Sequence, residues 1–334
     1  MSGRPPFARS PARPVTRRQM LLASGQLLAA APLRAAHLSD YPSHPIRLIV
    51  PMAPGGAADG VLRPLAATLS RSLGQTVFTE YWPGAGTLIG TQQVARARAD
   101  GYTVGFVTSA HAIHAAMRRS QGVDLHAEVA PVSLAGYYAM GLVAHPDLAA
   151  DSIDELIALA LREPGALEYG SLGMGTAMHL AGELLATSAG MNWVHVPYGA
   201  SSGLYRDLLG GRVRLAFATL ASALPYLRAG RLKMLGLTNA RRIEDFPELP
   251  TIAETVADFE VLGFFGFVAP PRTPGAIVDR LAAELSAALR APAVKHQLAA
   301  QGAVAWGSTA GEFEAYMRAA TLRYGALAKA AGLT

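Results

Sequence analysis

The sequence predicts an α/β protein of two lobes, each a mainly parallel sheet flanked by helices, with crossover strands joining the lobes. The first supporting observation is that short β-branched apolar runs alternate with helical periodicity over residues 46–108 and again over 152–238. Such alternation is typical of parallel sheets whose faces are covered by helices. The second is a pair of apolar stretches, 133–144 and 259–269, that bracket the second unit. We interpret these stretches as the crossover strands.

The first unit begins with the apolar run 46–50, which is short, β-branched and followed by Pro51, as expected of a buried strand. Gly74 ends the helical periodicity that follows, at the position where a left-handed glycine commonly terminates a helix. The expected strands of this unit are 46–50, 76–82 and 102–108, and the expected helices are 61–73 and 87–99.

The second unit opens with a helix, because Ser152 and Glu155 have the spacing of a capping box. From Pro274 onward the pattern is wholly helical, and Thr309 with Glu312 forms a second capping box. The expected strands are 167–172, 193–198, 213–219 and 232–238, and the expected helices are 176–188, 202–209, 221–229, 274–290, 292–301 and one that starts at 309.

The first 36 residues have the pattern of an export signal. Five arginines precede an apolar run, 20–31, that is too short to span a bilayer and is followed by small residues. Residues 16–21 also resemble a twin-arginine signal, although other secretory signals can carry paired arginines. We expect cleavage near Ala35 or Ala36 and a periplasmic mature protein, with an uncleaved anchor or tail as the alternative.

The charge balance argues against a nucleic-acid partner. The chain has 29 Lys and Arg against 24 Asp and Glu, but six of the arginines and no acidic residue lie in residues 1–36, so 23 basic and 24 acidic residues remain. No basic excess is left to attract nucleic acid or an anionic membrane. The absence of cysteine excludes disulfides, thiolate zinc sites and cysteine nucleophiles. We expect a monomer without a cofactor.

A glycine-rich loop, VPMAPGGAAD at 50–59, leaves a predicted strand and enters a predicted helix. Ligands of open α/β sheets bind outside the carboxyl ends of strands, and helix N-termini attract anions through unpaired N–H groups. Gly55 and Gly56 leave this backbone unobstructed, and Asp59 can cap the helix and fix the loop. The alternative is an ordinary strand-to-helix turn, since one such loop is weak evidence.

A second loop, SLGMGTAMH at 171–179, repeats this arrangement, with Thr176 as the expected helix cap. Further hydroxyls follow other predicted strands, at Thr108, Ser109, Thr219 and Ser222. None of these loops contains Lys or Arg. A carboxylate would therefore be held by hydrogen bonds and dipoles alone, which suits reversible capture better than phosphoryl chemistry.

Signals of enzyme activity are poor, and we predict that the protein is not an enzyme. Tyr169 replaces the first glycine of a Gly-x-Ser-x-Gly nucleophile elbow, and no nucleotide-binding glycine motif is present. His111 and His114 lack a third metal ligand. A secreted α/β hydrolase with a base-paired serine remains the alternative. We expect His179 near the cleft and His195 in the core, while Phe264 could form part of a cleft wall.

Several motifs together resemble one family, the solute receptors of tripartite tricarboxylate transporters, also called Bug receptors. The resemblance covers residues 41–333. It is carried by YPSHPIRLIVPMAPGGAAD (41–59), LGQTVFTEYWPGAGTLIG (73–90), DGYTV (100–104), APVSL (130–134), GSLGMGTAMHLAGELL (170–185), VHVPY (194–198), DLLGGRV (207–213) and ELPTIAE (248–254).

The resemblance implies a type II-like periplasmic binding protein that closes around a small organic carboxylate, a mono- or dicarboxylate, for uptake by a membrane permease. It further implies that residues 41–140 with 263–334 form one lobe and that 141–262 form the other. A ligand sensor that presents to a signalling partner is the alternative.

The resemblance also implies that loops 54–59 and 171–176 face each other and hold one carboxylate. The expected ligand-binding residues are Pro54, Gly55, Gly56, Ala57, Asp59, Ser109, Ser171, Gly175, Thr176, His179, Thr219 and Ser222. The chain departs from the family pattern at FATLASA (217–223), at 199–201 and at Phe264, where family members often have Phe-Asp-Asn-Leu-Pro-Ser-Ala, Lys-Gly-Ser and Trp. These departures could alter the ligand.

Overall fold

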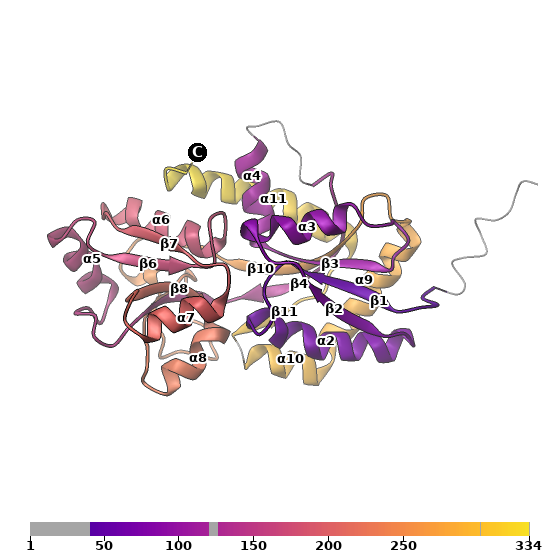
Figure 1. Cartoon of the computed structure of the whole chain (residues 1–334), viewed down its shortest axis with the longest axis horizontal. Coiled ribbons are helices and arrows are strands. Elements are labelled where there is room, and N and C mark those ends of the chain that lie inside the picture. The colour runs from indigo at the N-terminus through magenta and orange to yellow at the C-terminus, as the bar shows by residue number, and fades with distance from the viewer. Residues whose placement is uncertain (1–40, 120–125, 301, 334) are drawn as a thin grey trace, which may run out of the picture. The chain divides into compact units, whose positions relative to one another are not determined.

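Two α/β sheets organise the described chain (Figure 1). A computed structural model describes residues 41–119, 126–300 and 302–333; the predicted export signal at 1–36 lies outside these residues. The first sheet has the strand order β11-β4-β10-β3-β1-β2 and the second has the order β7-β6-β8-β5-β9. No helix in the described ranges is long and apolar enough to cross a membrane.

The strands of the first sheet are β1 (Ile46–Val50), β2 (Val77–Tyr81), β3 (Thr103–Thr108), β4 (Ala130–Tyr138), β10 (Gly263–Ala269) and β11 (Ala303–Ala305). Its helices are α2 (Ala57–Leu73), η1 (Ala85–Thr87), α3 (Leu88–Ala95), α4 (Ser109–Arg119), α9 (Gly275–Arg290), α10 (Pro292–Ala299) and α11 (Ala310–Ala330). Helices α2, α9 and α10 cover one face of this sheet, and α3, α4 and α11 cover the other (Figure 1).

The strands of the second sheet are β5 (Met140–Ala144), β6 (Glu168–Ser171), β7 (Val194–Pro197), β8 (Leu215–Thr219) and β9 (Lys233–Leu237). Its helices are α5 (Ile153–Arg162), α6 (Ala177–Ala189), α7 (Ser201–Leu209), α8 (Leu220–Arg228) and η2 (Ile252–Glu254).

Both sheets are mixed, whereas the sequence led us to expect mainly parallel ones. In the first sheet β1 is parallel to β2 and β3, but β10 is antiparallel to β3 and β4, and β11 is antiparallel to β4. In the second, β6 is parallel to β7 and β8, but β5 is antiparallel to β8 and β9. The antiparallel pairs arise because β4, β5 and β10 belong to segments that pass from one sheet to the other.

The chain crosses between the sheets at Ala139, which separates β4 from β5. Both backbone polar groups of Ala139 are bonded: its N–H donates to the Gly302 carbonyl and its carbonyl accepts the Leu220 N–H. The second predicted crossover stretch, 259–269, is a strand only from Gly263. Before that point the Val261 N–H donates to the Thr238 carbonyl, so the crossing segments are joined by main-chain hydrogen bonds.

Helix ends follow the sequence signals with some differences. Gly74 ends α2 in the left-handed conformation, with φ of 67°. The Ser152 hydroxyl accepts the Glu155 N–H, but the Glu155 carboxylate binds the Asp151 N–H, so only half of that capping box forms. Both halves form at Thr309. The strand β11 interrupts the expected helical end of the chain, and α4 follows β3 without an intervening loop.

Candidate ligand-binding site

A cavity of about 1160 Å³ lies at the carboxyl ends of three parallel strands from each sheet. The segments that follow β1, β2 and β3 line it from the first sheet, and those that follow β6, β7 and β8 line it from the second. This is the position at which open α/β sheets bind ligands, because the loops after the strands diverge there.

Six helices of the described chain begin at this cavity. Its lining includes residues at the starts of α2, η1 with α3, α4, α6, α7 and α8, namely Ala57, Thr87, Ser109, Ala177, Ser201 and Ser222. Each N-terminus carries a partial positive charge from the helix dipole. No Asp or Glu is among the described lining residues, and their only Lys or Arg is Arg206, whose side chain is 75% exposed and paired with Asp207. The cavity therefore attracts anions mainly through the main chain.

The loop after β1 presents the uncapped N-terminus of α2. Gly56 is the N-cap, and no side chain bonds there in place of a ligand. Asp59 lies in the first turn with its side chain 8% exposed, and its two oxygens accept the Gly55 N–H at 2.7 Å and the Tyr81 hydroxyl at 2.7 Å. Within the described chain, the N–H groups of Gly56, Ala57 and Ala58 make no hydrogen bond. Asp59 thus holds the loop from behind and leaves the next three donors available.

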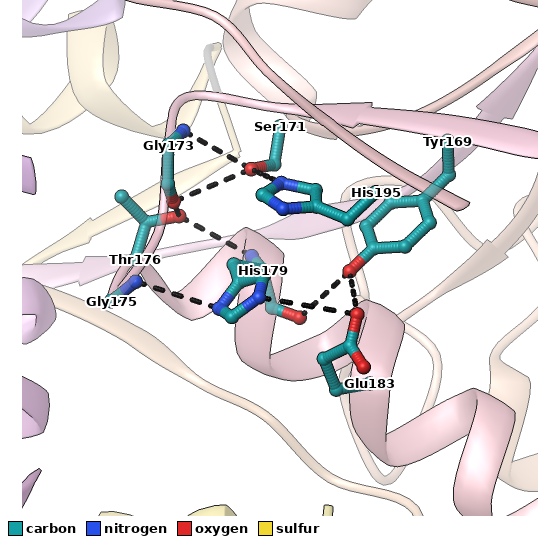
Figure 2. A network of polar contacts seen from close by, with 8 residues as sticks. All are labelled: Tyr169, Ser171, Gly173, Gly175, Thr176, His179, Glu183 and His195. Carbon is teal, nitrogen blue, oxygen red and sulfur yellow. Dashed lines mark hydrogen bonds and ion pairs between the residues drawn. The ribbon is translucent and has the colours of Figure 1, made fainter. Parts of the chain in front are cut away.

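The loop after β6 satisfies its own polar groups (Figure 2). The Ser171 hydroxyl lies 2.7 Å from His195 Nε2 and accepts the Gly173 N–H at 3.1 Å. The Gly175 N–H donates to His179 Nδ1 at 3.5 Å. Thr176 caps α6 by accepting the His179 N–H, and its own hydroxyl donates to the Gly173 carbonyl at 2.7 Å. These internal bonds make the loop a rigid wall rather than a row of donors.

Two histidines that lie side by side in the fold support this wall in their neutral form. The ring centroids of His179 and His195 are 4.4 Å apart. Burial, with a smaller contribution from His179, lowers the pKa of His195 to about 4. Burial also lowers the pKa of His179, although Glu183 opposes that effect. Neutral His179 can keep an unprotonated Nδ1, which the hydrogen bond from Gly175 requires.

The pair Ser171–His195 has the spacing of a nucleophile and its base, which the hydrolase alternative requires. However, Ser171 is fully buried and does not line the cavity. A substrate in the cavity would not reach the Ser171 hydroxyl. The hydrogen bond between Ser171 and His195 instead holds the loop after β6 in its conformation.

The N-terminus of α7 also lines the cavity, close to the N-terminus of α2. The N-cap of α7, Ala200, offers no side-chain bond, and Ser201 and Ser202 line the cavity without a side-chain partner among the described residues. The Ser201 Oγ lies 3.5 Å from the position that a Cβ on Gly56 would occupy. Sequence reasoning recognised the helix but missed this role. The signal was available, because two serines open this helix and three residues separate it from the end of β7.

Comparison with known proteins assigns this arrangement to a family. Residues 61–333 match the family described as the tripartite tricarboxylate transporter family receptor. The chain belongs to this receptor family. The protein BugT of Bordetella pertussis is 36% identical over 291 residues, which are 85% of this chain and 89% of BugT.

Solved structures agree with this assignment. The periplasmic binding protein BugD superposes with a TM-score of 0.82 and 30% identity, over 88% of this chain and 99% of BugD. An R. palustris protein with adipate superposes with a TM-score of 0.83 and 33% identity, over 88% of this chain and 99% of that one. This chain is therefore a solute-binding receptor with the fold of the periplasmic binding proteins.

The receptor's cavity collects most of the predicted ligand-binding residues. Those that line it are Pro54, Gly55, Gly56, Ala57, Ser109, Thr176, Thr219 and Ser222. Asp59, Ser171, Gly175 and His179 do not line it and instead support the two loops from behind. Gly175 has a steric role as well, because a Cβ there would lie 2.3 Å from the His114 ring.

The structure also places two other side chains that the sequence analysis named, Phe264 and His111. Phe264 is not part of the cavity wall: its ring packs against Tyr316 and other rings of α11, while the next residue, Phe265, lines the cavity. Successive side chains of a strand point to opposite faces of the sheet, so Phe265 reaches the cavity when Phe264 does not. His111 is buried with both ring nitrogens unpartnered, and no metal-binding cluster occurs among the described residues.

Proposed function

We propose that this receptor captures a small organic acid by its carboxylate between the N-termini of α2 and α7. One observation carries the proposal: six helix N-termini converge on one cavity whose described lining has no acidic side chain. Helix N-termini bind carboxylates through free N–H groups and the dipole. A related protein of 33% identity binds adipate, which is an acid of this class.

In this proposal the main chain of the loop at 54–59 donates to the carboxylate. The N–H groups of Gly56, Ala57 and Ala58 are unpaired, and the Ser201 hydroxyl oxygen lies 3.5 Å from the position that a Cβ on Gly56 would occupy. The loop at 171–176 gives the wall its shape. Ser109, Thr219 and Ser222 border the space that the rest of the ligand would fill.

We further propose that the ligand closes two lobes, residues 41–140 with 263–334 and residues 141–262. A volume of about 1160 Å³ slightly exceeds the range of about 300–1,000 Å³ usual for small-ligand pockets. A small acid would leave much of it filled with water, so closure would improve the contact.

The remaining parts of the proposal concern the receptor's place in the cell. The chain is exported by the signal at 1–36, is cleaved near Ala35 or Ala36, works as a monomer in the periplasm without catalysis, and delivers its ligand to a tripartite tricarboxylate permease. The receptor family and the sequence pattern of residues 1–36 support this.

Calorimetric titration with adipate tests the proposed site. Wild type should bind adipate, and Gly56→Val should bind it about 10–100-fold more weakly. The valine side chain would cover main-chain donors, and each lost hydrogen bond to the charged carboxylate is worth about 1.5–3 kcal/mol. Gly56 has φ of −90°, and a Cβ there would make only ordinary van der Waals contact, with Ser201 Oγ at 3.5 Å and the Ala53 carbonyl oxygen at 3.9 Å, so the variant should fold. Gly311→Val, at the start of α11 and away from the cavity, is the matched control. Equal affinity of Gly56→Val and wild type would refute the site.

A further inference from the structure

We propose that the cavity selects an acid whose body is an aromatic ring rather than a chain ending in a second carboxylate. This inference rests on the proposed function, since it assumes that the carboxylate is held at α2 and α7. It concerns the part of the ligand beyond the bound carboxylate.

The first argument is the stripe of side chains that α7 turns toward the cavity. Ser202, Tyr205, Arg206 and Leu209 all line it, at the i, i+3, i+4 and i+7 spacing of one helix face. Seven residues of helix extend about 10 Å. A ligand anchored at the first turn of α7 would therefore lie along the face that carries Tyr205, and one about 10 Å long would reach Leu209.

The second argument is the aromatic character of this wall. Tyr198, Tyr205 and Tyr226 line the cavity together with Leu172 and Leu209. The rings of Tyr205 and Tyr226 are stacked with centroids 4.8 Å apart. Tyr205 is 6% exposed, so it fixes the position of the half-buried Tyr226. Tyr205 covers one face of Tyr226, and the Arg231 guanidinium lies over the Tyr226 ring, 6.0 Å from its centroid. Tyr226 can therefore meet a further ring through its edge, a contact that adds to the burial of apolar area.

The third argument is the use of hydroxyl protons beside this wall. The Ser222 hydroxyl lies 2.9 Å from the Thr219 carbonyl oxygen, to which it can donate. When it does, the hydroxyls of Tyr205 and Thr219, each 2.8 Å from the Ser222 oxygen, both donate to that oxygen. In this arrangement the cluster offers a ligand only oxygen lone pairs, which disfavour a second carboxylate but not a neutral ring.

Arg206 is the one Lys or Arg among the described lining residues that could pair with a second carboxylate. Its Nε already binds the Asp207 carboxylate at 3.2 Å, and its side chain is 75% exposed. An exposed, paired guanidinium adds little to binding. The inference therefore predicts that Arg206 is dispensable and that Tyr226 is not.

The test compares three acids, benzoate, hexanoate and adipate, by calorimetric titration. Hexanoate and adipate differ by the second carboxylate, while benzoate and hexanoate differ by the ring. We expect wild type to bind benzoate at least 10-fold more tightly than either aliphatic acid. Tyr226→Leu should lower benzoate affinity at least 5-fold and hexanoate affinity less than 2-fold. Tyr226→Phe, which keeps the ring, should bind benzoate as tightly as wild type does.

Two controls complete the test. Arg206→Gln should change no affinity by more than 2-fold, and Phe78→Leu, at an exposed site on β2 outside the cavity, should change none. Tightest binding of adipate, with a 10-fold loss in Arg206→Gln, would overturn the inference. So would equal binding of benzoate and hexanoate. Either result would leave the proposed function standing if Gly56→Val still weakened binding; no binding of any acid by wild type would refute both.

Discussion

The loop after β1 and the loop after β6 each place two glycines between a strand and a helix, but they use their N–H groups differently. In the first, Asp59 accepts the Gly55 N–H and leaves the following donors free. In the second, Ser171 and His179 accept the N–H groups of Gly173 and Gly175. One loop is thus a donor surface supported by a carboxylate. The other is a wall supported by imidazole and hydroxyl groups.

The comparison teaches that glycine content does not identify a ligand-binding loop. What matters is whether a side chain of the protein already bonds to the exposed N–H groups. The loops should consequently respond in different ways to substitution and to pH, and four experiments test this, in order of decreasing expected effect.

Asp59→Ala should have the largest effect, about 2–4 kcal/mol of unfolding free energy. It removes the acceptor of two hydrogen bonds to a buried charged group, each worth about 1.5–3 kcal/mol before the loop relaxes. We expected Asp59 to cap the helix and fix the loop; the structure shows no side-chain cap, and Asp59 fixes the loop, so the loss should exceed that of a helix cap, about 0.5–2 kcal/mol. Urea denaturation measures the change. Asp59→Asn, which keeps one acceptor oxygen, should lose about half as much; a loss below 1 kcal/mol in the alanine variant would contradict this account.

Gly55→Val should cost about 1–3 kcal/mol of stability. Gly55 has φ of +82°, a conformation that a β-branched residue strongly disfavours. Gly56 has no such restraint, so Gly56→Val should melt within a few degrees of wild type. Parallel thermal melts of the two variants distinguish strain from blocked donors. Equal melting temperatures for both would show that the loop relaxes without strain.

Acidification should weaken the second loop before the first. The folded pKa values of His195, about 4, and of His179 lie below the ordinary value of 6.5. The unfolded chain therefore takes up protons first, so this stability is fully present above about pH 6.5 and is lost as the pH falls toward 4. For His195 the loss between pH 7 and 5 is at most about 2 kcal/mol, and less because the ring is only half-buried.

Urea midpoints at pH 7 and pH 5 check this prediction. His195→Gln should reduce the difference between the two midpoints, since its amide does not titrate. The remaining pH dependence should include His111, whose pKa burial lowers to about 3. A variant with the same pH dependence as wild type would show that His195 does not contribute.

Thr176→Ala should have the smallest effect, about 1 kcal/mol of stability from the lost helix cap. Its hydroxyl proton is already used by the Gly173 carbonyl, so affinity for a bound acid should change less than 2-fold. Titration and urea denaturation on the same preparation measure both quantities. A 10-fold loss of affinity at unchanged stability would make Thr176 a direct ligand contact.

Local signals were sufficient to predict much of the fold. The β-branched run 46–50, the glycine at 74 and the capping box at Thr309 each depend on neighbours in sequence, and the structure has all three features. Helix α4 was not predicted because Ser109 continues directly from β3 without a turn residue. The three-residue strand β11 is too short to have a pattern of its own.

The roles within the site were less predictable, because hydrogen-bond acceptors come from distant positions. Ser171 was expected to face the ligand, but its hydroxyl lies against His195, 24 residues away. Phe264 and Phe265 differ only in which face of β10 they occupy, and sequence alone does not fix that register. The aromatic wall was missed because its tyrosines lie on separate elements: Tyr198 follows β7, Tyr205 is on α7 and Tyr226 is on α8.

The unpaired main-chain N–H groups at the start of α2 have an evolutionary consequence. A donor that belongs to the backbone is not deleted by the common substitutions that remove a side-chain ligand, so a binding site of this kind tolerates sequence drift. The tyrosines and hydroxyls at the other end of the cavity have no such protection. A lineage could therefore exchange one acid for another by changing that wall alone, while every descendant kept the same means of holding a carboxylate.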